Sequence, residues 1–312
     1  MKIQPLFELG MFSNNRIHAT LKKYLLDTIV FTGEYGLAPD GLHYRWEIDT
    51  SCDAYIFHAT PGGDSYRKLL WGDKDWVIRL LEEVERNPNI ILFEAHNPMV
   101  MYPEWVKDKD VIQSYSLADN YPEHLNLITY PMPGSGRWID EDIFHRKEEI
   151  DKDEGRILVS KDQLKRNLYE TMFNFGNPLH VLGAGNQSFL GHIRDNDTYS
   201  IIYPEDSDKL NDLYNTMDYA VNFQPVGFES WLVEARFCGV KCYYPDSPHW
   251  RSIFGDENVG FFDLEDIEGT LNLENDMTES DIAYSRQKWG AEHRVPIFWE
   301  EIRNRITPEH SD

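Results

Sequence analysis

The chain has 312 residues, 41% of them hydrophobic, which is enough apolar material to form the cores of two α/β domains or one large one. Its 54 acidic and 30 basic side chains give a net charge of -24, which excludes a uniformly basic surface for nucleic acid or anionic membranes. The three cysteines, Cys52, Cys238 and Cys242, show no metal-ligand or CxxC spacing, so we expect neither a zinc site nor a disulfide framework, and a reducing cytoplasm fits best. No apolar run approaches the roughly 20 residues of a membrane-spanning helix, so we expect a soluble protein.

The first half of the chain alternates strands and helices. Residues 53–58 and 89–94 are short, apolar and rich in β-formers, which predicts buried parallel strands. The segment between them carries apolar residues at helical spacing before Asn87-Pro88 ends it, namely Val77, Leu80, Leu81 and Val84. This pattern predicts a βαβ unit.

A charged segment without aromatic residues, 146–155, ends in glycine and is the best candidate for a linker. After it the alternation begins afresh, with strands predicted at 156–160, 180–183, 199–203, 219–223 and 240–244. We therefore predict an N-terminal domain, 1–150, and a C-terminal domain, 151–312. Each is expected to be a Rossmann-like, doubly wound parallel sheet, and such sheets bind ligands at the carboxyl ends of their strands. A cleft between the domains is the expected site.

The most informative segment is 222–244. A strand ends near Phe223, a loop containing Gly227 follows, and Ser230 can cap a helix that Gly239 ends. The backbone amides at the start of such a helix form an anion site, and Glu234 in its opening turns is suited to accept hydrogen bonds from a ribose diol. The alternative is that Glu234 only complements the helix dipole.

This segment resembles the signature of GT-B glycosyltransferases, particularly the retaining glycosyltransferase family 4, whose motif is Glu-Gly-Phe-Gly-x-x-x-x-Glu-Ala-x-x-x-Gly-x-Pro. The residues that match at the family's spacing are Gly227, Phe228, Glu234, Ala235 and Gly239. The family's first glutamate falls on Val226, which departs from the motif. Since that carboxylate usually contacts the donor sugar, either the sugar pocket differs, or Glu229 substitutes for it, or activity is impaired.

Weaker matches follow the family's order along nearly the whole chain. Residues 53–58 and 90–96 resemble its two strand-and-histidine elements, and His96 takes the position of a histidine that lines the catalytic cleft. Residues 298–303 resemble its final helix, which crosses back to the first domain. The resemblance implies a GT-B fold whose N-terminal domain binds the acceptor and whose C-terminal domain binds a nucleotide sugar.

Basic residues follow the first predicted strand of the second half. Lys161, Lys165 and Arg166 lie at the start of a predicted helix, where each cation opposes the helix dipole by roughly 0.3–1 kcal/mol. Their placement makes sense if a nucleotide diphosphate binds there, and family members carry basic residues in this region. The alternative is a solvated basic patch.

The resemblance implies an enzyme that transfers a hexosyl or pentosyl group from a nucleotide-diphosphate sugar, such as a UDP-sugar, to a hydroxyl of a glycan or small molecule, with retention of configuration. We expect Lys161, Lys165, Gly227, Phe228 and Glu234 to bind the donor, and His96 and Glu229 to serve catalysis. We expect no cofactor and no metal, because the Asp-x-Asp sequences at 151–153 and 195–197 fall in a linker and a loop.

Three other functions fit the same pattern. A nucleotide-sugar epimerase or hydrolase shares the fold, and Val226 is compatible with a non-catalytic GT-B binding module. The compact length also resembles viral enzymes that glycosylate hydroxymethylated pyrimidines of DNA in the host cytoplasm. The net charge of -24 places DNA below a glycan or small molecule as the acceptor.

Overall fold

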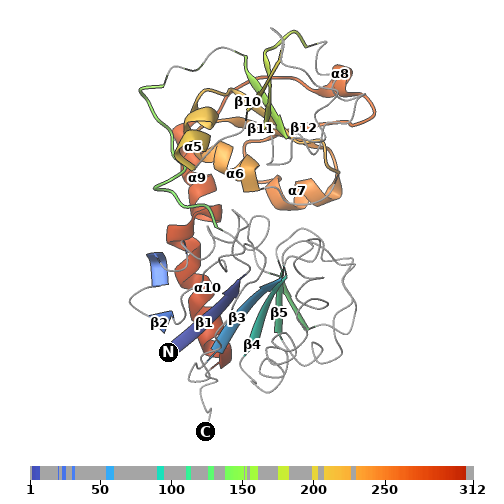
Figure 1. Cartoon of the computed structure of the whole chain (residues 1–312). Coiled ribbons are helices and arrows are strands. Elements are labelled where there is room, and N and C mark those ends of the chain that lie inside the picture. The colour runs from blue at the N-terminus through green and yellow to red at the C-terminus, as the bar shows by residue number, and fades with distance from the viewer. Residues whose placement is uncertain are drawn as a thin grey trace, which may run out of the picture. The chain divides into compact units, whose positions relative to one another are not determined.

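The computed structural model describes residues 2–7, 20, 23–25, 30–31, 54–59, 90–94, 110–113, 126–129, 138–150, 152, 155–160, 175–182, 199–202, 207–225 and 230–306. The chain forms two compact units (Figure 1). Unit 1 comprises Met1–Trp138 and Ala291–Asp312, and unit 2 comprises Ile139–Gly290. The charged segment 146–155 lies within unit 2. Among the described helices, none combines the length and the apolar character that crossing a membrane requires.

Unit 1 contains a six-stranded sheet in the order β2-β1-β3-β4-β5-β6, and every neighbouring pair is parallel. The strands are β1 (Lys2–Phe7), β2 (Val30–Phe31), β3 (Ala54–Ala59), β4 (Ile90–Glu94), β5 (Asp110–Gln113) and β6 (Asn126–Thr129). The strands predicted at 53–58 and 89–94 are confirmed as β3 and β4, which pair with each other. An all-parallel sheet that starts from an interior strand is doubly wound, as predicted.

The final helix, α10 (Ala291–Ile306), belongs to unit 1. Val295, Phe298 and Trp299 recur at helical spacing and are buried. The ring of Phe298 packs on Trp138, with 4.8 Å between the ring centroids. The last stretch of the chain is thus attached to unit 1 by an apolar stripe.

Unit 2 contains a second six-stranded parallel sheet, in the order β12-β11-β10-β7-β8-β9. Its strands are β7 (Ile157–Ser160), β8 (Leu179–Leu182), β9 (Tyr199–Ile202), β10 (Tyr219–Val221), β11 (Lys241–Pro245) and β12 (Gly260–Phe262). Counted from β7, this is the strand order of the dinucleotide-binding Rossmann fold, 3-2-1-4-5-6. Successive strands are added to one side of β7 as far as β9 and to its other side from β10 on, so the strand order reverses between β7 and β10.

The core of unit 2 lies along this sheet, where fully buried Ile157, Val159, Val181 and Val221 pack with Phe262. Near-continuous burial of strand residues is expected for a parallel sheet that is covered on both faces. Within the described residues of unit 2, the helices are α5 (Ser207–Asn215), α6 (Ser230–Phe237), α7 (Pro248–Phe254), α8 (Ile267–Thr270) and α9 (Glu279–Trp289).

Local sequence explains several helix ends. Ser247 caps α7 by accepting from the Trp250 amide, with Pro248 as the first helical residue. Thr278 and Asp281 form a reciprocal capping box at the start of α9. Such caps satisfy amides that have no partner within the helix.

Helix α6 is buried along its whole described length and contacts α5, α9 and β11. It ends as predicted at Gly239, which has a φ of +79°. The Gly239 amide donates to Arg236 O (2.9 Å) and the Val240 amide to Ala235 O (3.1 Å), the two bonds of a Schellman motif. Glycine is favoured there because a side chain opposes the left-handed conformation.

Candidate functional site

The strand order of unit 2 places two carboxyl ends next to each other at the point where the sheet reverses. β7 and β10 pair in parallel with Val159 opposite Val221, so Ser160 and Asn222 follow at the same edge. In doubly wound sheets the chains leaving two such strands turn to opposite faces and leave a crevice in which ligands bind. The basic stretch that starts at Lys161 follows the first strand, and the loop containing Gly227 follows the second.

Six of the predicted site residues lie outside the described part of the chain, namely His96, Lys161, Lys165, Gly227, Phe228 and Glu229. Their roles stay predictions. Glu234 is described, and Ser230, which we expected to cap its helix, is the first described residue of α6.

Glu234 lies in the middle of α6, with 2% of its surface exposed. Its Oε2 accepts a hydrogen bond of 3.0 Å from the hydroxyl of Tyr214, a residue of α5 that has no exposed surface. Side chains on an α-helix lean toward its amino end, so the carboxylate lies over the preceding turn of α6. That is the end of the helix that follows the carboxyl edge of β10.

The start of the loop between β10 and α6 is fixed by side chains on both sides. Asn222 is fully buried, and its Oδ1 accepts from the Gln224 amide (3.2 Å) while its Nδ2 donates to Gln224 O (3.3 Å). The indole Nε1 of Trp250, on α7, donates to the same carbonyl (2.8 Å). These hydrogen bonds therefore fix the backbone at the start of the loop between β10 and α6. An asparagine directly after a strand is a signal for such a turn, whereas nothing local points to Trp250.

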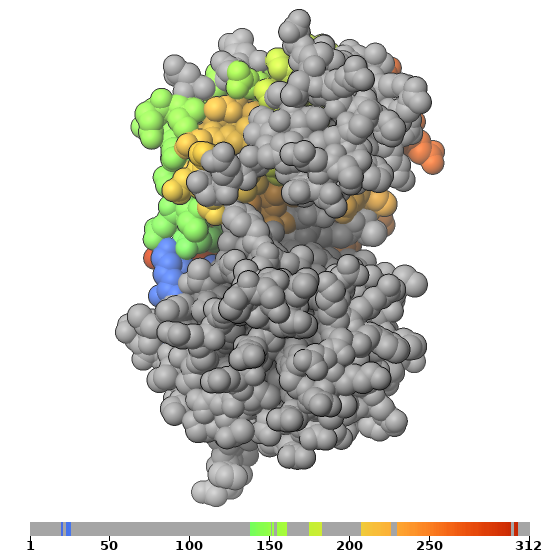
Figure 2. Space-filling view, in the orientation of Figure 1, coloured from blue at the N-terminus to red at the C-terminus, as the bar shows by residue number. Residues whose placement is uncertain are grey.

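A second group of polar contacts joins α5 to the segment at 145–147. The Asn211 Oδ1 accepts from the His145 amide (3.2 Å), and the Asn215 Oδ1 accepts from the Lys147 amide (2.7 Å). Asn215 also donates from Nδ2 to His145 O (2.9 Å). Figure 2 shows residues 139–150 and α5 adjoining on one face of the molecule. These bonds fix α5, the helix that carries Tyr214.

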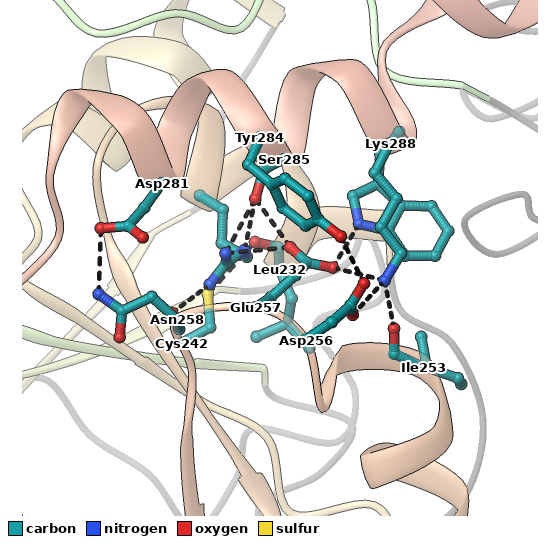
Figure 3. Close-up of polar contacts among 12 residues, drawn as sticks. Leu232, Cys242, Ile253, Asp256, Glu257, Asn258, Asp281, Tyr284, Ser285 and Lys288 are labelled. Carbon is teal, nitrogen blue, oxygen red and sulfur yellow. Dashed lines mark hydrogen bonds and ion pairs between the residues drawn. The ribbon is translucent and has the colours of Figure 1, made fainter.

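On its other side, α6 is joined by a buried ion pair to Glu257, in the segment before β12, and by hydrogen bonds to Ser285 on α9 (Figure 3). Arg236 Nη2 lies 3.0 Å from Glu257 Oε2, and Arg236 Nε donates to the Ser285 hydroxyl (3.1 Å). Arg236 Nη1 donates to Asn258 O (2.8 Å), and Glu257 Oε1 accepts from the Trp289 indole (2.8 Å). Because Arg236 is enclosed and multiply bonded, we assign it to holding α6 in place.

No family model matches the chain, and a comparison with curated proteins found no match. Solved structures do match over the full length. HepE from Anabaena, solved in complex with UDP-glucose, has a TM-score of 0.62 at 11% identity and covers 96% of this chain and 100% of its own. Sucrose-phosphate synthase from Thermosynechococcus elongatus has a TM-score of 0.60 at 12% identity, with 98% and 97% covered. A glycosyltransferase from Rickettsia africae has a TM-score of 0.59 at 12% identity, with 99% of each chain covered.

The chain has the GT-B fold. The similarity extends over both units, so the predicted α/β architecture of two Rossmann-like domains is confirmed. The likeness to these GT-B structures concerns the fold, and membership of family 4 stays a prediction. Within this GT-B chain, the edge of the unit 2 sheet at β7 and β10 is the candidate site.

Proposed function

We propose that the chain is a glycosyltransferase that moves a sugar from a nucleotide-diphosphate sugar to a hydroxyl of a glycan or small molecule. The observation that carries the proposal is the strand order of unit 2, which brings the chain segments leaving β7 and β10 to one edge. These are the two segments that hold the expected donor residues. The full-length GT-B similarity supports the reaction class, and the UDP-glucose bound to HepE supports a UDP-sugar donor.

In this proposal the donor lies at the carboxyl edge of the unit 2 sheet. Lys161 and Lys165 bind the diphosphate together with backbone amides near Gly227 and Phe228, because cations and helix-start amides both favour negative charge. Glu234 accepts hydrogen bonds from the ribose hydroxyls. The anchored Gln224 carbonyl supports this arrangement, since it sets where the loop to α6 begins.

Catalysis rests on stabilising the negative charge that develops on the departing diphosphate. We propose that the basic residues and amides supply this stabilisation without a metal ion and that the anomeric configuration is retained, as in the family that the motif resembles. His96 and Glu229 act near the donor sugar. Glu229 takes the place of the family's first carboxylate, since Val226 cannot provide one.

The acceptor is proposed to be uncharged or only weakly charged. A chain with a net charge of -24 repels polyanions, and binding to a DNA backbone requires basic side chains that neutralise phosphates. A glycan or a small metabolite is not subject to this electrostatic repulsion. Transfer to hydroxymethylated DNA is an outcome that the acceptor assay distinguishes.

The proposal is tested with a panel of UDP-, GDP-, ADP- and TDP-sugars. A donor that binds the folded state alone raises the melting temperature, by an amount that corresponds to about 2.7 kcal/mol at 100 times its Kd. Turnover is then measured with and without acceptors. Transfer to an acceptor supports the proposal, release of a free or altered sugar from donor alone supports an epimerase or hydrolase, and binding without turnover supports a binding module.

Matched variants connect the activity to the site. We expect Lys161→Ala and Lys165→Ala to weaken donor binding, whereas Lys209→Ala, on the exposed side of α5, should not. The assignment fails if no donor raises the melting temperature, or if Lys165→Ala and Glu234→Ala leave every detectable activity unchanged. The anomeric proton coupling of the product, read by NMR, tests retention.

A further inference from the structure

The carboxylate of Glu234 is held by a phenol that comes from a different helix. Tyr214 Oη donates to Glu234 Oε2 over 3.0 Å, and both side chains are buried. We propose that Tyr214 is a positioning residue, which holds Glu234 in the orientation that accepts the ribose hydroxyls of the donor. The inference rests on the proposed function.

Tyr214 is itself held firmly. It has no exposed surface, and its ring packs against Phe144 with 5.9 Å between the centroids. Its helix, α5, is bound to residues 145–147 through Asn211 and Asn215. A ring enclosed in this way has few rotamers available, so the direction in which its hydroxyl points is set by packing.

A glutamate needs such a partner if its carboxylate is to accept hydrogen bonds from the ribose in one fixed orientation. Its side chain has several rotatable bonds, and fixing them in advance removes an entropic cost that ligand binding would otherwise bear. A hydrogen bond to an ionised group is stronger than one between neutral groups, so one phenol is enough to select an orientation. Because the phenol is neutral, it orients the carboxylate without adding a cation that would compete with the ribose hydroxyls.

The structure offers a matched control in the same unit. Tyr284, on α9, donates through its hydroxyl to the carboxylate of Asp256, and its side chain is exposed. Tyr284→Phe therefore removes the same kind of phenol–carboxylate hydrogen bond at the surface. Tyr214→Phe removes it in the interior while keeping the shape of the ring.

The experiment measures discrimination between ribose and 2′-deoxyribose by calorimetry, in the full-length protein. The probes are the pairs UDP and dUDP, GDP and dGDP, and ADP and dADP. We expect the wild-type chain to bind the ribose member of its preferred pair at least about tenfold more tightly, because the deoxy form offers the buried carboxylate one hydroxyl donor fewer. Tyr214→Phe should reduce the ratio of the two dissociation constants, deoxy over ribose, about fivefold or more. Tyr284→Phe should leave this ratio unchanged.

A double variant tests whether Tyr214 acts through Glu234. In the Glu234→Gln background the ratio is already low, and Tyr214→Phe should lower it no further, since the two changes then share one effect. A further drop in that background overturns the inference. So does a Tyr214→Phe variant that weakens both members of the pair equally, because that is the result of a purely structural role.

The remaining outcomes separate this inference from the proposed function. If the wild-type chain binds no nucleoside diphosphate, the proposed function fails and the inference fails with it. If it binds both members of a pair equally well, donor binding stands and the positioning of Glu234 is overturned. Should Tyr214→Phe not fold, Phe144→Leu serves as the second variant, because it loosens the tyrosine ring while keeping the hydroxyl, and an unchanged ratio there overturns the inference.

Discussion

Arg236 and Glu257 form an ion pair from which water is excluded. The Nη2–Oε2 distance is 3.0 Å, and both side chains have 0% exposed surface. The pair joins α6, which carries Glu234, to the segment before β12, and through Ser285 and Trp289 it also reaches α9. The position of the proposed donor helix therefore depends on a charge pair deep in unit 2.

Breaking this ion pair should strongly destabilise the folded protein. We expect Arg236→Met to lower the free energy of unfolding by about 3 kcal/mol, because it leaves the buried Glu257 carboxylate with Lys288 (Nζ–Oε1 3.2 Å) in place of two cationic partners. Urea denaturation followed by tryptophan fluorescence measures the loss. As a control, Asp246→Asn removes the exposed ion pair with Arg251 (Nη2–Oδ2 2.8 Å) and should leave the midpoint of the urea transition nearly unchanged. Equal losses in the two variants would contradict the role assigned to Arg236.

The end of α6 should tolerate only residues that adopt a left-handed conformation. At Gly239, with a φ of +79°, we expect Gly239→Ala to lower the free energy of unfolding by about 1–2 kcal/mol. Gly239→Asn should lower it less, because asparagine visits this conformation more readily. Thermal melts of wild type, Gly239→Asn and Gly239→Ala test this order of stability. An alanine variant as stable as wild type would show that the backbone relaxes at this position.

The two cysteines of unit 2 should be unreactive in the folded protein. Burial raises the pKa of Cys242 to about 12, and burial likewise raises the pKa of Cys238 well above its ordinary value. At pH 8 a thiol with the first of these values is ionised in only about one molecule in 10,000. Iodoacetamide followed by peptide mass mapping should therefore label Cys238 and Cys242 in the denatured chain but not in the native one. Native labelling of peptides containing Cys238 or Cys242 would refute this.

Acid should remove the contribution that ionised Asp276 makes to the stability of the folded protein. The hydrogen bond from Lys241 Nζ, 2.5 Å long, lowers the pKa of Asp276 below its ordinary value of 3.8. Since the folded state favours the ionised form, the stabilisation is present above the unfolded pKa and disappears as the pH falls through the folded pKa. We expect Asp276→Asn to melt below wild type at about pH 6, and we expect this difference in melting temperature to shrink as the pH falls below 3.8. A difference that persists in acid would show that the contact does not depend on charge.

Much of the fold could be predicted because its signals are local. Leu210, Leu213 and Tyr214 repeat at helical spacing, and they are buried on α5 as the pattern indicates. The apolar runs at 156–160 and 219–223 became β7 and β10 because strands of a covered parallel sheet are apolar on both faces. β12 was missed, since Gly260–Phe262 is too short to show a period.

The site was predicted less fully, for a physical reason. Glu234 could be singled out because the motif fixes its distance from Gly227 and Gly239 along the chain. Its partner Tyr214 lies 20 positions earlier on another helix, and its core-like spacing gave no sign of a polar role. Trp250 likewise reaches Gln224 across 26 positions. Contacts of this kind depend on how helices pack, which a local pattern does not specify.

Hydrogen–deuterium exchange with and without the nucleoside diphosphate that binds best tests most directly where the donor lies. We predict slower exchange on binding in peptides covering residues 157–166 and 222–237, the segments that leave β7 and β10, and no change in the peptide covering 263–275. Protection confined to peptides within 1–138, or an unchanged exchange pattern in unit 2 at saturating nucleotide, would contradict it.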